Sequence, residues 1–173
     1  MMLHKLFPVI LLTLLLSPAS ALDPTQQSEM VTAHNKWRAQ VGAPDLKWSD
    51  DLATGAQTWA DHLKTAEGCN LVHSTSNVGE NLYWASASTS DNGDSTAQMV
   101  TPTQVTDFWG GEKQDYSYDS NSCADGKVCG HYTQLVWKKT SDVGCGSAVC
   151  SDKSQVWVCQ YNPAGNMAGE KAY

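Results

Sequence analysis

The chain has 173 residues and a formal net charge of −7, with 18 acidic side chains against 11 basic ones. Without residues 1–21, which contain one lysine and no acidic residue, the balance becomes 10 minus 18, or −8. An acidic chain with a single arginine lacks the basic surface that binds nucleic acid or adheres to anionic lipid by charge. We therefore expect no nucleic-acid partner.

The first 21 residues have the three parts of a secretory signal peptide. Lys5 supplies a positive charge, residues 6–16 are apolar, and Ala19-Ser20-Ala21 is a small-x-small cleavage signal. The apolar run is shorter than the ~20 residues that span a bilayer, and no later run reaches that length. These features predict a signal peptide over 1–21 and a secreted, extracellular protein that is not integral to a membrane. They also predict one domain over 22–173, since that length is common for a single domain; we expect a monomer.

Apolar spacing predicts four helices in chain order. The first covers 25–41 and has a stripe at i, i+4, i+7 and i+11: Met30, His34, Trp37 and Val41. The second begins at the N-cap Ser49 and ends near Gly68. The third covers 103–112 with Val105, Phe108 and Trp109 on its core face, and the fourth covers 131–138. Residues 85–101, which follow Trp84 and are rich in Ser, Thr, Asp and Gly, are expected to form a mobile polar loop. Residues 114–127 are expected to be irregular chain.

The six cysteines predict three disulfides, because an even count after a signal peptide is typical of an oxidised, secreted domain. Residues 143–149 and 155–161 form two strands of a hairpin centred on Asp152, which places Cys145 opposite Cys159. Cys123 and Cys129 flank a short loop and pair with each other. Cys150 then remains for Cys69. Helices followed by a terminal antiparallel hairpin predict an α+β fold with helices stacked on a small sheet.

Four titratable side chains stand out as a candidate site: His73, Glu80, Glu112 and His131. Glu112 ends the apolar stripe of the third helix, and Glu80 precedes an apolar segment. Each of the four, taken alone, is also explained as a satisfied residue at the core boundary. If they converge, two imidazoles and two carboxylates form a set that suits a divalent cation.

Several segments of the chain resemble the CAP superfamily (cysteine-rich secretory proteins, antigen 5, pathogenesis-related 1), and most of all its pathogenesis-related 1 group. The resemblance covers about residues 28–170. It is carried by the segments Ala33-His34-Asn35-Lys36-Trp37-Arg38, Leu46-Lys47-Trp48-Ser49-Asp50-Asp51-Leu52-Ala53, Cys69-Asn70-Leu71-Val72-His73-Ser74, Gly79-Glu80-Asn81-Leu82, Gly130-His131-Tyr132-Thr133-Gln134-Leu135-Val136-Trp137, and Val158-Cys159-Gln160-Tyr161-Asn162-Pro163-Ala164-Gly165-Asn166.

This resemblance implies a three-layer α-β-α sandwich with a small antiparallel sheet between helical layers, and the same disulfide pairing. It implies a central cleft formed by His73, Glu80, Glu112 and His131, in which zinc or another divalent cation binds through His73 and His131. It further implies a non-enzymatic secreted protein that binds a sterol or fatty acid and acts in defence or host interaction.

Two alternative functions stay open. One is a precursor of a C-terminal signalling peptide from residues 163–173, although the chain ends Lys171-Ala172-Tyr173 where plant relatives usually end Arg-Pro-Tyr. The other is a metal-dependent hydrolase, since two histidines and two glutamates can activate water. The chain has no His-Glu-x-x-His or Gly-x-Ser-x-Gly motif. The aromatic segment Tyr116-Ser117-Tyr118 either lines a lipid pocket or packs against its own loop, and packing is favoured.

Overall fold

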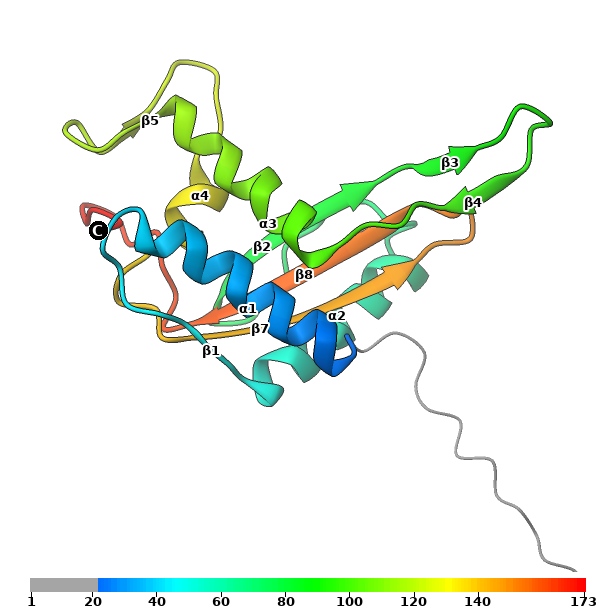
Figure 1. Ribbon diagram of the computed structural model, residues 1–173, viewed down its shortest axis with the longest axis horizontal. Helices are drawn as coiled ribbons and strands as arrows, with labels where there is room; N and C mark the ends of the chain where they lie inside the picture. Colours follow the sequence, from blue (N-terminus) through cyan, green and yellow to red (C-terminus); the bar gives the residue numbers. More distant parts are fainter. Residues whose placement is uncertain (1–21) are drawn as a thin grey trace, which may run out of the picture.

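A computed structural model describes residues 22–173, so the predicted signal peptide 1–21 lies outside the described residues. The chain forms three layers, with a central sheet between helices (Figure 1). This is the α+β sandwich expected from the sequence. Within the described range, no helix has the length and apolar character needed to cross a bilayer.

The elements follow one another in a mixed order. The helices are α1 (Pro24–Ala39), α2 (Asp50–Thr65), α3 (Pro102–Gly111), the 3₁₀ turn η1 (Glu112–Asp115) and α4 (Gly130–Leu135). The strands are β1 (Lys47–Trp48), β2 (Gly79–Ala85), β3 (Ala87–Thr89), β4 (Ser95–Ala97), β5 (Tyr116–Ser117), β6 (Ser122–Cys123), β7 (Asp142–Val149) and β8 (Gln155–Asn162).

The central sheet has the order β1-β7-β8-β2. β7 and β8 form the predicted hairpin, with Cys145 opposite Cys159. β2 pairs antiparallel with β8 and forms one edge, while the short β1 lies parallel to β7 at the other. Neither edge strand was predicted, because β1 has only two residues and β2 carries a glutamate and an asparagine beside its apolar residues.

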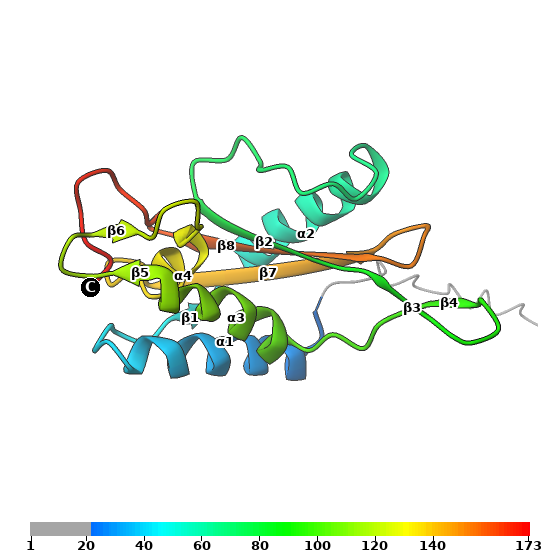
Figure 2. The same cartoon turned by 90° about the horizontal axis from the view of Figure 1, so that it is seen from above.

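Each face of the sheet packs on a different helix layer (Figure 2). On one face α2 covers the sheet, and this part of the core contains Ala56, Ala60, Leu63, Leu82, Val156 and Val158. On the other face lie α1 and α3, with Met30, Val105, Trp109, Val143, Trp157 and Tyr161. Gly144 lets α2 approach β7 closely, because a Cβ there would overlap the backbone of Ala53.

Four sequence predictions were wrong in part. Residues 114–127 are not wholly irregular, because η1 extends to Asp115 and β5 pairs antiparallel with β6. Residues 85–101 are not one loop: β3 and β4 form a hairpin that extends beyond the layers (Figure 1), and Trp84 lies in β2. The two strands pair antiparallel, with Ala87 opposite Ala97 and Thr89 opposite Ser95, and the turn between them contains Gly93 at φ 88°. The fourth helix ends at Leu135 rather than at residue 138, because Arg38 binds the carbonyls of Leu135 and Trp137. Phe108 is 60% exposed and contacts Tyr83 edge-on instead of joining the core.

Three disulfides join the pairs expected from the sequence: Cys69–Cys150, Cys123–Cys129 and Cys145–Cys159. The first connects the segment after α2 to the β7–β8 turn. The second closes the loop before α4. The third crosses between paired strands in the core. They fix segments that surround the candidate site, including the one that carries His73.

Candidate functional site

His73 is paired with Glu80. Its Nδ1 lies 2.8 Å from Glu80 Oε1, and the same oxygen accepts the backbone N–H of Ser74 at 2.9 Å. Glu80 Oε2 accepts from Gln160 Nε2 at 3.3 Å. The glutamate side chain is 5% exposed, whereas the imidazole is 63% exposed. A buried carboxylate therefore holds a histidine that faces solvent.

His131 is paired with Glu112 in the same manner. Its Nδ1 lies 2.6 Å from Glu112 Oε1, while Glu112 Oε2 accepts the backbone N–H groups of His131 and Tyr132 at 2.9 and 3.1 Å. The carboxylate thus binds backbone donors in the first turn of α4. The ring of Trp109 stacks on His131 at 6.4 Å between centroids.

The two pairs flank the edge strand β2. Glu80 and Asn81 are successive strand residues, so their side chains point to opposite faces of the sheet. Glu80 meets His73, and Asn81 Nδ2 donates to the backbone carbonyl of His131 at 3.1 Å. The structure therefore brings together His73 with Glu80 and His131 with Glu112. The approach of the two imidazoles to each other stays a prediction.

Both histidines have the tautomer that suits a metal ligand. A carboxylate oxygen facing Nδ1 favours the proton on that nitrogen, and in a neutral ring this leaves the Nε2 lone pair for a metal. Within residues 22–173, neither Nε2 atom makes a hydrogen bond. No three His, Cys, Asp or Glu side chains in that range converge on a possible metal position. A cation bound by both rings would be held by the two imidazoles and water, while Glu80 and Glu112 would keep His73 and His131 in place through Nδ1.

A buried polar chain lies behind the site. Asn81 Nδ2 donates to the Tyr161 hydroxyl at 3.2 Å, and that hydroxyl donates to His34 Nε2 at 2.9 Å. His34 Nδ1 donates to the Met30 carbonyl at 2.7 Å. Burial lowers the pKa of His34 to about 4, so it is neutral at physiological pH. Burial also raises the pKa of the Tyr161 hydroxyl. This chain connects the core of α1 to the backbone of His131.

The sequence analysis placed His34 in the core stripe of the first helix but assigned no role to Asn81 or Tyr161. A histidine in an otherwise apolar stripe was the available signal, because a buried imidazole needs partners for both nitrogens. Its partner Tyr161 is 127 residues away in the chain, and spacing could not reveal it.

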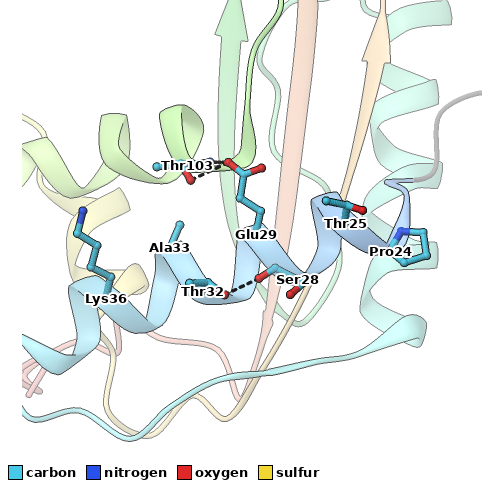
Figure 3. Close-up of a pocket in the computed structure, with 8 residues that line it drawn as sticks. All are labelled: Pro24, Thr25, Ser28, Glu29, Thr32, Ala33, Lys36 and Thr103. Carbon is cyan, nitrogen blue, oxygen red and sulfur yellow. Dashed lines mark hydrogen bonds between the residues drawn. The ribbon is translucent and has the colours of Figure 1, made fainter.

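A second feature is an open groove between α1 and α3, with a volume of about 750 Å³. In Figure 3, Glu29 reaches from α1 to Thr103 of α3, and its Oε1 accepts from the Thr103 backbone at 3.1 Å and hydroxyl at 2.7 Å. In the same view, Pro24 lies at one end of the labelled part of α1 and Lys36 toward the opposite end. The lining comprises Pro24, Thr25, Ser28, Glu29, Thr32, Ala33, Lys36 and Thr103.

The layered fold and its three disulfides define a class of disulfide-linked α-β-α sandwich domains. The sequence pattern of the Cysteine-rich secretory protein family, CAP, matches residues 31–161, and the chain belongs to this family. It is 41% identical over 168 residues to pathogenesis-related protein 1C of Nicotiana tabacum, covering 97% of this chain and 92% of that protein. It is 39% identical over 170 residues to pathogenesis-related protein PRMS of Zea mays, covering 95% of each.

Solved structures show the same fold. BmVAL-1 superposes with a TM-score of 0.69 at 26% identity, covering 90% of this chain and 85% of that one. NaASP2, solved with Zn²⁺, superposes with a TM-score of 0.65 at 23% identity, covering 90% and 88%. Manganese-bound Ac-ASP-7 gives a TM-score of 0.55 at 14% identity, covering 87% and 75%. At these last two identities the likeness concerns the fold alone.

Proposed function

We propose that the protein is a secreted, non-enzymatic binding module of the pathogenesis-related 1 type. It holds a divalent cation between His73 and His131 and a fatty acid or sterol in the groove between α1 and α3. The observation that carries the proposal is that two histidines, each fixed through Nδ1 by a carboxylate, flank one strand with both Nε2 atoms unpartnered among the described residues. A defence role is supported by the pathogenesis-related names of the Nicotiana and Zea relatives.

The cation is the better supported of the two ligands. Histidines that bind metal usually donate their other ring N–H to a carboxylate, as both do here. Two imidazoles leave positions for water, a set that zinc accepts. The zinc in the NaASP2 structure and the manganese in Ac-ASP-7 support a cation in this fold family.

The state of the carboxylates favours binding over catalysis. Glu80 accepts hydrogen bonds from His73, Ser74 and Gln160. Glu112 accepts from the His131 ring and from two backbone N–H groups. A general base needs a free lone pair within reach of the proton it removes. Each glutamate uses three of its about four acceptor sites on its histidine and the surrounding donors, which suits it to holding the histidine in place.

The groove between α1 and α3 favours a fatty acid over a sterol. Its volume lies in the range of ligand pockets, about 300 to 1,000 Å³. Lys36 supplies an ammonium group for a carboxylate head. The side chains of Pro24 and Ala33, with the threonine methyl groups, offer apolar surface for the acyl chain.

Zinc binding tests the cation site. Native mass spectrometry of the secreted protein should show one zinc per chain, and the double variant His73→Ala/His131→Ala should show none. The control is His62→Ala, which removes a histidine outside the proposed site. This histidine also pairs with a glutamate, since His62 Nε2 lies 3.3 Å from Glu67 Oε1. Retention of zinc by the double variant would contradict the proposal, as would a crystal structure with the two rings more than about 10 Å apart.

Fatty-acid binding tests the groove separately. Titration with a fluorescent fatty acid should give saturable binding that Lys36→Glu weakens at least tenfold, since it replaces the ammonium with a like charge. Lys64→Glu makes the same charge change on the exposed face of α2 and should have no effect. The double histidine variant should keep its fatty-acid affinity. If labelled fatty acid and sterol both fail to bind the wild type, the lipid half of the proposal is wrong.

A further inference from the structure

The last residues of the chain are seated on the body of the protein. After β8 ends at Asn162, residues 163–173 form no helix or strand. Yet Ala172 is only 1% exposed and belongs to a core cluster with Tyr132, Leu135, Val136 and Trp137. Its carbonyl accepts the backbone N–H of Lys138 at 2.7 Å. Figure 2 shows the C-terminus beside β5, in agreement with the contact between Tyr116 and Tyr173.

The terminal residue Tyr173 lies between aromatic rings. It stacks on Tyr118, with centroids 4.5 Å apart and planes at 11°, and it contacts Tyr116 edge-on at 6.5 Å. The Tyr118 hydroxyl donates to the backbone oxygen of Tyr173. Stacking and hydrogen bonding from the same ring fix both the side chain and the chain end. The segment Tyr116-Ser117-Tyr118 thus packs against the tail.

Lys171 and Glu170 each make their own contacts with the body of the protein. Lys171 Nζ lies 4.3 Å from the centroid of the Tyr118 ring, on its face. The Glu170 carboxylate pairs with Lys139 Nζ at 2.7 Å, and its backbone carbonyl accepts from Asn121 Nδ2 at 2.9 Å. All of the last four residues therefore make specific contacts. We call the receiving surface the tail cradle, formed by Tyr116, Tyr118, Asn121, Tyr132, Lys138 and Lys139.

The tail is attached at two ends and separated from the body between them. Asn166 bonds to Thr133 and to the Gly130 carbonyl of α4, at 2.7 and 2.9 Å. Beyond it, Met167 is 53% exposed, and a cavity of about 350 Å³ lies between residues 166–170 and the body. The last four residues thus contact the body as a separate unit, and the chain between Asn166 and Glu170 does not hold them in place.

We propose that the tail cradle is a peptide-binding site for a segment of the form acidic-basic-small-aromatic, and that the protein's own residues 170–173 are its resident ligand. Among residues 163–173, no disulfide and no strand pairing holds the tail. Displacement of the tail opens the cradle to a second peptide of the same chemistry. The ligand is a peptide of this pattern, recognised by ring stacking, a buried small side chain and paired charges.

The test uses the full chain with its tail ejected from the cradle. Ala172→Asp places a carboxylate where the side chain is buried, and a buried unpaired charge is costly enough to expel it. The matched control is Ala168→Asp, the same change at an exposed position of the same tail. The probe is a labelled peptide Gly-Glu-Lys-Ala-Tyr, identical to residues 169–173, followed by fluorescence anisotropy.

We expect Ala172→Asp to bind the probe at least tenfold more tightly than the wild type or Ala168→Asp, in which the resident tail competes. A probe ending in Ala instead of Tyr should bind at least tenfold more weakly. Hydrogen exchange of the Lys138 amide reports whether the tail has left. If that amide exchanges fast in Ala172→Asp while the probe still fails to bind, the cradle is not a peptide site. If its exchange is unchanged, Ala172 does not hold the tail and the proposal fails.

Discussion

His34 is a buried residue whose protonation state links the stability of the fold to pH. Burial lowers its pKa from 6.5 to about 4, because the surroundings disfavour a charged ring. Above pH 6.5 both folded and unfolded chains carry a neutral ring, and the folded state has its full stability. As pH falls from 6.5 toward 4, the unfolded state takes up a proton that the folded state refuses, and stability is lost.

We therefore expect the free energy of unfolding to fall by about 2 to 3 kcal/mol from this residue between pH 7 and pH 4.5, at ~1.4 kcal/mol per pH unit below 6.5. Urea unfolding at the two pH values measures it. In His34→Gln, which has no titrating ring, the difference between the two pH values should be smaller by that amount. If the free energy of unfolding differs by the same amount between the two pH values in variant and wild type, His34 does not cause the loss of stability at acid pH.

Arg38 is the one arginine of the chain and is fully buried. Its guanidinium donates to the backbone carbonyls of Pro44, Leu135, Trp137 and Thr140 at 2.6 to 3.1 Å. Burial lowers its pKa to about 10, so it stays charged at neutral pH. It joins α1 to the end of α4 and the turn that follows.

Arg38→Lys should lower the free energy of unfolding by about 2 to 4 kcal/mol. The planar guanidinium presents its N–H groups to four separate carbonyls, which one lysine ammonium cannot reach together. Each buried carbonyl left without a donor costs about 1 to 3 kcal/mol. Chemical denaturation measures the loss. The reverse exchange at an exposed position, Lys64→Arg, should stay within about 0.5 kcal/mol. A neutral effect of Arg38→Lys would mean that the carbonyls have other partners.

At the scale of elements, the long disulfide matters most for α2 and the segment that carries His73. Cys69 and Cys150 are separated by 81 residues, against 6 for Cys123 and Cys129. In the loop-entropy description their contributions are about 4.5 and 2.4 kcal/mol, as upper values. Replacing Cys69 and Cys150 by serine should lower the melting temperature more than replacing Cys123 and Cys129. A scanning calorimeter decides this, and the reverse order would count against the entropic account.

The contact of α2 with β7 depends on a glycine. A Cβ at Gly144 would overlap the backbone of Ala53, and backbone cannot move aside as a side chain end can. Gly144→Ala should therefore cost about 1 to 3 kcal/mol of stability, the usual range for overpacking. Gly111→Ala meets no atom within 4 Å and should be neutral or slightly stabilising. Equal effects of the two substitutions in thermal melts would remove the packing argument.

Which elements the sequence could predict depended on whether their signal was local. The hairpin of β7 and β8 was predictable because its turn and two cysteines fix one register. β2 was missed because, as an edge strand, it mixes the buried Leu82 with the exposed Trp84. Phe108 was expected in the core on helical spacing, but α3 turns it outward against Tyr83.

For the whole molecule, the layered fold could be predicted from the sequence. His73, Glu80, Glu112 and His131 stay a predicted site, and the sequence did not indicate which histidine pairs with which glutamate. Glu112 and His131 are 19 residues apart and meet only because η1 follows α3 directly beside the start of α4. Likewise, His73 lies in a segment without regular structure, and Glu80 orients it through a tertiary contact. The tail cradle had no local signal, since its partners come from the loop after η1, from α4 and from the chain end.

The short helix α4 has one further consequence. His131, at its start, is fixed by Glu112, whereas Tyr132 and Leu135 pack with Ala172, and Thr133 bonds to Asn166. If a cation binds His131 and a peptide binds the tail cradle, as proposed, both ligands contact or adjoin the six residues of α4. Thermodynamic linkage then requires reciprocity: if an occupied cradle raises cation affinity by some factor, the cation raises peptide affinity by that same factor.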